Sequence, residues 1–94
     1  MLFRSRELKN NLDADGTPLL NSSVLTCTSE ISYGNGHQMN NLPVIVAGRA
    51  GGIKTGRHLV VSPQPIANLY VSMLNAVDID TTTFGNSTGA LSLV

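Results

Sequence analysis

Charged residues, aromatic residues and cysteine are all scarce in this chain of 94 residues. A single cysteine excludes an internal disulfide and any cysteine-rich zinc site. Six basic and six acidic residues give a net charge of zero, which argues against a nucleic-acid-binding protein because such proteins carry a basic excess. No apolar run approaches the roughly 20 residues of a membrane span, and no apolar stretch follows the first residues as it would in a signal peptide.

The residues that are present point to one small folded domain. Hydrophobic side chains make up 41% of the chain, too many for a disordered protein of zero net charge. Two short, β-branched apolar runs predict core strands at residues 24–28 and 44–48. The second run does not alternate with polar residues, which is typical of a strand buried on both faces of a parallel sheet. We expect the two strands to be neighbours in one sheet, with Cys27 as a buried, inert thiol.

Helical spacing predicts one packing helix over residues 66–77, opened by a Ser-Pro-Gln-Pro segment. Its apolar stripe consists of Ile66, Leu69, Tyr70, Met73, Leu74 and Val77. Residues 2–12 predict the end of another helix, and residues 53–61 predict a small hairpin that turns near Gly56. Residues 78–94 are rich in Thr, Gly and Asn and predict an irregular segment.

These elements together predict an α/β fold made of two core strands, a small hairpin and one packing helix. The first helix has no N-cap residue or lead-in, so we expect residues 1–94 to form a single incomplete domain, without a second domain. Its main partner would then be the missing N-terminal part of the same domain. An open sheet edge also predicts marginal stability or self-association.

The polar loop of residues 29–41 is the candidate site. It places Glu30 just past the first strand, His37 in its middle, and Asn40 and Asn41 before the second strand. A carboxylate, an imidazole and an amide suit a divalent cation such as zinc, or a phosphate-like ligand. Any metal would need further ligands from elsewhere, and an ordinary polar surface loop explains the same residues.

Two other motifs have simple alternatives. The segment 48–55 is similar to a phosphate-binding P-loop, but Ile53 separates the glycines from Lys54, so a sharp exit from the sheet is the better interpretation. Lys54, Arg57 and His58 would form a small anion patch or simply face solvent.

Several motifs, in order over about residues 12–91, resemble one family. They are Asp15-Gly16-Thr17, Ser29–His37, Asn41–Gly52, Lys54–Leu59, Asn68-Leu69-Tyr70 and Phe84–Gly89. The family they resemble is the domain-of-unknown-function family numbered fifteen fifty-two, whose members are mostly exported bacterial proteins several times longer than this chain. The chain is similar to the carboxyl-terminal part of that family, which itself looks remotely like the alkaline phosphatase and sulfatase superfamily.

The resemblance implies the C-terminal part of a doubly wound α/β sheet in a periplasmic or extracellular protein. It also implies that Glu30 and His37 help to bind a divalent metal, while Asn40 or Asn41 orients a ligand. The superfamily's nucleophile would lie in sequence upstream of Met1, so the resemblance assigns no catalytic residue to this chain and predicts that it is inactive alone.

Two hypotheses follow for the whole protein. One is a metal-dependent hydrolase, and the other is a non-enzymatic binding or structural scaffold with a degenerate phosphatase-like site. The second is favoured by two departures from the superfamily pattern. An Asp-His pair is absent after the first strand, where Glu30-Ile31 stands, and a second histidine is absent shortly after His37.

Overall fold

The computed structural model describes all 94 residues as a mixed α/β structure. Its helices are α1 (Leu2–Asn10) and α2 (Ala67–Ala76), and its strands are β1 (Leu25–Thr28) and β2 (Val44–Ala47). Three short 3-10 turns complete it: η1 (Leu19–Ser22), η2 (Gly34–Gly36) and η3 (Ala50–Gly52). Neither helix is long and apolar enough to cross a membrane.

The two strands pair with each other, as the sequence predicts, and each lies within a residue of its expected bounds. They run antiparallel, with Leu25 opposite Ala47 and Thr28 opposite Val44. The parallel arrangement suggested by the apolar run is therefore wrong for this pair. A parallel pair needs a crossover, usually through a helix, whereas the chain between β1 and β2 contains only the short turn η2.

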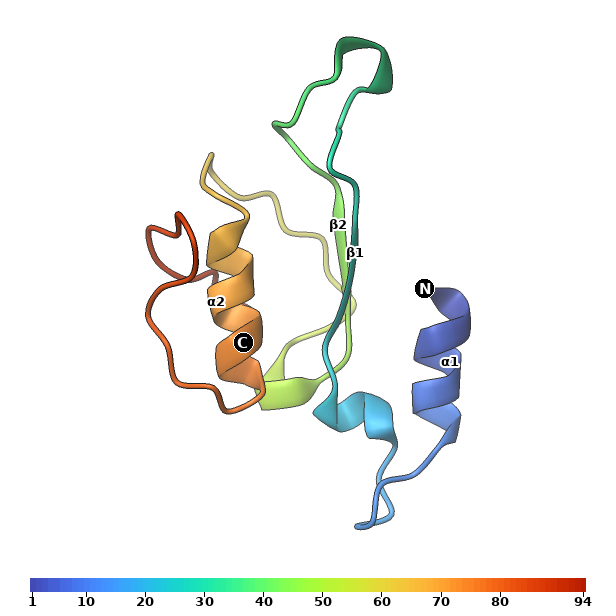
Figure 1. Ribbon diagram of the computed structural model, residues 1–94. Helices are drawn as coiled ribbons and strands as arrows, with labels where there is room; N and C mark the ends of the chain where they lie inside the picture. The colour runs from blue at the N-terminus through green and yellow to red at the C-terminus, as the bar shows by residue number, and fades with distance from the viewer.

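Helix α2 covers one face of this hairpin, as Figure 1 shows. The central core cluster consists of Ile53, Leu69 and Leu93, with Val24, Val44, Val46, Ile66, Met73, Ala76 and Leu91 packed around them. Ala50, Ala67 and Val71 are buried as well. Thr26 donates a hydrogen bond from Oγ1 to Met73 Sδ at 3.7 Å, which places the strand face of Thr26 against the helix. Burial of these aliphatic side chains is the main stabilising contribution to the fold.

The other face of the hairpin is uncovered. Ile45 is 61% exposed, and its register partner Cys27 is also exposed. The predicted burial of Cys27 is therefore wrong, because strand residues alternate between faces and only one face has a covering helix. In Figure 1, α1 stands apart from α2; it contacts η1 but contains no buried residue.

The hairpin predicted over residues 53–61 does not form. Ile53 belongs to the core, but residues 54–61 are exposed and contain no strand. The one backbone hydrogen bond that pairs this segment with another part of the chain runs from Lys54 N to Leu93 O at 2.9 Å. A two-stranded hairpin is marginal in water unless one face packs on a core, and Val60 and its neighbours have no such surface.

The C-terminal segment is irregular, as predicted, but it packs along α2. Two polar residues of the helix hold it there. Asn68, only 3% exposed, bonds to Thr88 through both side-chain atoms. The Ser72 hydroxyl accepts a hydrogen bond from Leu91 N at 2.8 Å and donates one to Leu91 O at 2.6 Å. Helix α2 is therefore covered on two sides, by the sheet and by this segment.

Candidate functional site

The candidate loop extends the β-hairpin beyond the body of the molecule, as Figure 1 shows. Its base is joined where Thr28 Oγ1 donates to Pro43 O at 3.1 Å. Near its tip, Tyr33 and Gln38 form an isolated bridge, and the backbone N–H of Ser32 donates to Gln38 O at 2.8 Å. The loop is thus a narrow extension of the hairpin that closes through the turn η2.

His37 follows this turn in a left-handed backbone conformation, with φ of 51°. Asn41 has a similar conformation, with φ of 56°. Non-glycine residues visit this region infrequently, and asparagine and histidine do so more readily than most. The residue types at these two positions are therefore accounted for by turn geometry.

The four residues predicted as a site remain separate. Glu30, His37, Asn40 and Asn41 are all exposed, and none of their side chains forms a hydrogen bond within the chain. No group of three or more His, Cys, Asp or Glu side chains gathers anywhere in the chain. Because zinc sites in proteins use three or four protein ligands, Glu30 and His37 do not make up a complete metal site.

The basic patch near residue 57 has a structural role in part. The Arg57 guanidinium donates from Nε to Lys54 O at 3.0 Å and from a terminal nitrogen to Leu93 O at 2.6 Å. It therefore ties the C-terminal segment to the residues that follow the core residue Ile53. Lys54 and His58 are exposed beside it.

The P-loop-like glycines also have local explanations. Gly48 has φ of +114°, and a Cβ there would collide with the carbonyl of Ser23. Gly51 has φ of +60°, and a Cβ there would come within 2.7 Å of Ala76 Cα. These glycines allow the chain to leave β2 and pass close to η1 and α2, which supports the interpretation as a sharp exit from the sheet.

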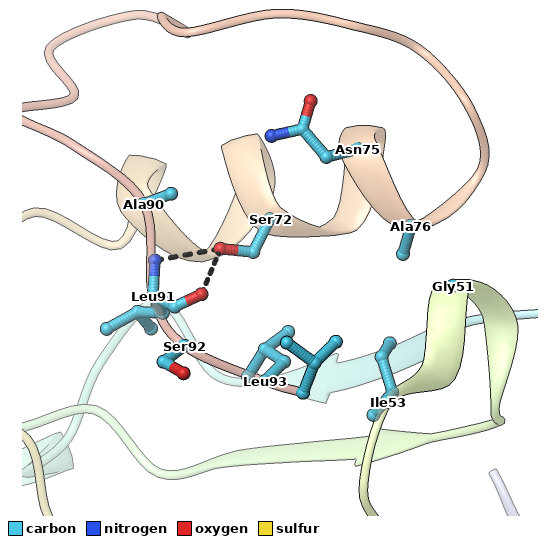
Figure 2. A pocket seen from close by; sticks show the side chains of 10 residues that line it. Gly51, Ile53, Ser72, Asn75, Ala76, Ala90, Leu91, Ser92 and Leu93 are labelled. Atoms are coloured by element: carbon cyan, nitrogen blue, oxygen red, sulfur yellow. Dashed lines mark hydrogen bonds between the residues drawn. The ribbon is translucent and has the colours of Figure 1, made fainter.

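A shallow cavity of about 200 Å³ lies between α2, η3 and the C-terminal segment. Figure 2 shows Ile53 and Leu93 lining it from below and Ser72 from the helix. The Ser72 hydroxyl is already occupied by Leu91 in both directions, and no histidine, aspartate or glutamate side chain lines the cavity. Without a neighbouring base Ser72 is not an activated nucleophile, so the cavity is a packing feature.

Asn68 and Ser72 are the residues that sequence reasoning missed. They are four residues apart on the helix, on a different face from the predicted apolar stripe. Polar residues at i and i+4 lie on one face of a helix, and Asn75 extends this face. Because the polar face of an amphipathic helix ordinarily meets solvent, the sequence carried no signal that a segment covers Asn68 and Ser72.

The fold and geometry define a small mixed α/β structure with an open sheet face. The chain matches no family model, and no curated protein or solved structure matches it either.

Proposed function

We propose that the chain is the C-terminal part of a larger exported α/β protein related to the phosphatase and sulfatase superfamily, and that it has no activity on its own. The incomplete domain is supported by one observation, which is that the chain exposes more surface area than a compact protein of the same mass. The chain exposes 6818 Å², whereas a folded protein of 9.9 kDa exposes about 5,200 Å². Its radius of gyration of 14.5 Å also exceeds the roughly 12 Å of a compact domain of this length.

The additional exposed surface includes open sheet edges and an apolar sheet face, which the rest of a domain ordinarily covers. Both edges of the two-stranded sheet carry unpaired backbone groups, and such edges accept further strands. The uncovered face carries Ile45 and Cys27 side by side. Additional strands on either edge and a helix over this face would complete a layered α/β domain.

Within such a protein, the loop of residues 29–41 would contribute Glu30 and His37 to a divalent-metal site that hydrolyses phosphate or sulfate esters. Asn40 or Asn41 would orient the ligand. In this proposal the remaining ligands and the nucleophile would belong to the missing part, since no third ligand lies near these side chains. The resemblance of several motifs to the exported family supports this assignment.

A non-enzymatic scaffold is the second candidate, and one observation favours it. Glu30 and His37 are exposed and no supporting hydrogen bond orients either side chain, whereas metal-binding histidines usually have a partner that fixes the ring. In this version the loop is a surface for binding and the superfamily site is degenerate.

The reading frame upstream of the Met1 codon tests the larger protein directly. An open frame that continues for hundreds of codons supports it, and a stop codon with a ribosome-binding site just before Met1 contradicts it. In that larger protein, zinc affinity that is lost in His37→Ala supports the hydrolase, and the absence of any zinc affinity supports the scaffold.

The open sheet face has its own test in the isolated chain. We expect the chain to self-associate in sedimentation equilibrium, and Ile45→Lys to shift it toward monomer because a charge on the uncovered face opposes burial. Val60→Lys is the matched control, since Val60 is 90% exposed and lies outside the sheet. A monodisperse wild-type monomer with a cooperative melt would contradict the incomplete-domain proposal.

A further inference from the structure

The turn η2 at the tip of the candidate loop contains the sequence Gly34-Asn35-Gly36. The chain has nine asparagines, and Asn35 alone is followed by glycine. Asn35 is exposed and its side-chain amide forms no hydrogen bond in the structure. The side-chain carbonyl carbon of Asn35, Cγ, is therefore accessible, and Gly36 has no side chain that would shield it.

We infer that Asn35 is a site of spontaneous deamidation, through attack by the backbone nitrogen of Gly36. In the first step the Gly36 nitrogen loses its proton to hydroxide and attacks Cγ of Asn35. A nitrogen–carbon bond forms, the Cγ–Nδ2 bond breaks, and ammonia leaves after taking up a proton from water. Water then opens the resulting five-membered imide at either carbonyl, giving aspartate or isoaspartate. The reaction consumes only water, and nothing is oxidised or reduced.

The turn opposes this reaction only weakly. The attacking nitrogen, Gly36 N, donates to Tyr33 O at 3.2 Å, and His37 N donates to Gly34 O at 3.4 Å. The first distance lies at the long end of the roughly 2.7–3.2 Å range of backbone hydrogen bonds and the second lies beyond it, and short 3-10 turns have poor hydrogen-bond geometry. Exposed loop turns open locally at little cost in free energy, so the chain can reach the geometry required for attack.

Asp15-Gly16 is a second sequence that can form the same imide, and its hydrogen bonds oppose the reaction in a way that those of Asn35 do not. Asp15 also precedes a glycine, but its carboxylate accepts hydrogen bonds from Thr17 N at 3.0 Å and Thr17 Oγ1 at 2.7 Å. These bonds lower the pKa of Asp15 and so favour the ionised carboxylate, a poor electrophile. The attacking nitrogen, Gly16 N, is held by Asp13 O at 2.9 Å.

Other asparagines are protected in different ways. Asn68 is buried, and both of its side-chain atoms are bonded. Asn75 accepts a hydrogen bond from Thr81 N, and Asn11 donates one to Glu7 O. The remaining asparagines precede Asn, Ser or Leu, whose side chains obstruct the attack.

Deamidation would change the charge of the candidate loop. The chain would gain one carboxylate, ionised at neutral pH, so its net charge would change from zero to minus one. The new group would lie two positions before His37 in the loop that also contains Glu30. Deamidation at Asn35 does not depend on the proposed function, because it requires only the turn and its sequence.

The experiment is to incubate the purified chain at mildly alkaline pH and follow peptide masses after digestion. We expect the peptide containing Asn35 to gain about one dalton, the difference between an amide NH2 and a hydroxyl, together with isoaspartate detectable by enzymatic methylation. The other asparagine-containing peptides are expected to remain unchanged over the same period.

The matched variant is Gly36→Ala, because Gly36 does not have a positive φ. An added Cβ would come within 2.9 Å of the Tyr33 ring, which is an exposed side chain that can shift. We expect this variant to slow deamidation about tenfold or more, because the added methyl group restricts the backbone and obstructs the attack. Asn35→Gln should abolish the mass gain in this peptide.

A comparison with the urea-unfolded chain separates the role of the turn from that of sequence alone. We expect native and unfolded chains to deamidate at Asn35 within a few-fold of one another. An intact Asn35 in the native chain, when the unfolded chain reacts, would show that the turn protects it and would overturn the inference. Equal rates at several asparagines, or no effect of Gly36→Ala, would overturn it as well.

Discussion

Substituting Asn68 with alanine should destabilise the chain, because Asn68 joins α2 to the C-terminal segment. Its side chain donates to Gln64 Oε1 at 2.9 Å and to Thr88 Oγ1 at 3.1 Å, and accepts from Thr88 N at 2.8 Å. Each hydrogen bond makes a net contribution of about 1 kcal/mol to stability, so the three together contribute about 3 kcal/mol. Alanine recovers about half a kcal/mol of helix propensity, and the exposed Gln64 can bond to water instead. We therefore expect Asn68→Ala to cost about 2 kcal/mol.

The assay is urea unfolding followed by far-ultraviolet circular dichroism, with tyrosine fluorescence as a second probe, since the chain has no tryptophan. Asn75→Ala is the matched control. Asn75 lies on the same helix and gains similar propensity, but it is exposed and its side chain accepts one bond, from Thr81 N at 3.1 Å. We expect its unfolding midpoint to stay close to that of the wild type.

Equal midpoints for Asn68→Ala and Asn75→Ala would refute this role of Asn68. If Asn68→Ala fails to fold, Thr88→Val provides a milder test. It removes the Oγ1 acceptor but leaves the backbone bond from Thr88 N to Asn68 in place, and it should cost about 1 kcal/mol. An unchanged midpoint for Thr88→Val would also count against the joining role of Asn68.

Three further predictions concern other parts of the chain. Gly48→Ala should destabilise it by about 3 kcal/mol through strain and collision, whereas Gly52→Ala, with φ of +80° but open space around it, should cost about 1–2 kcal/mol; equal losses in urea unfolding would contradict the collision argument. The hydrogen bonds from Thr17 lower the pKa of Asp15, so their contribution to stability is present above the ordinary carboxyl pKa and is lost as the pH falls through the lowered value; Thr17→Val should raise the pKa of Asp15 in an NMR titration, and an unchanged pKa would refute the assignment. Val71 is 1% exposed, and Val71→Ala should lower the free energy of unfolding by about 2 kcal/mol. A decrease of less than half that amount in urea unfolding would show that the helix relaxes into the space left by the side chain.

The sequence predicted the local elements well because each depended on neighbouring residues. Val44–Ala47 is a strand because it is a continuous β-branched and apolar run, and α2 begins and ends within a residue of its predicted bounds because its spacing is helical. The antiparallel direction was missed. The apolar run of residues 44–48 was interpreted as a strand buried on both faces, which is typical of a parallel sheet, but an apolar run alone does not reveal whether both faces are covered. The hairpin at residues 53–61 was wrong for a similar reason, because a local turn signal does not supply a surface to pack on.

The candidate site was harder to predict than the fold. The loop lies where the sequence placed it, between the two strands, but nothing in the spacing of Glu30 and His37 required their side chains to converge. Asn68 and Ser72 owe their importance to a segment some twenty residues later in the chain. Such long-range partners do not appear in a local pattern, because a polar face on an amphipathic helix is equally typical of contact with solvent.

The length and exposure of the loop between β1 and β2 have a consequence for how two copies of the chain can combine. Of the core residues, only Val24 precedes this loop, and the rest follow it. Residues 1–28 are therefore held to the rest of the chain mainly by the β1–β2 ladder. The loop of residues 29–41 that connects the two parts packs against little else. If the loop opens as a hinge, β1 of one copy can pair with β2 of another and restore the same ladder. Such an exchange costs little free energy because the pairing between copies reproduces the pairing within one copy.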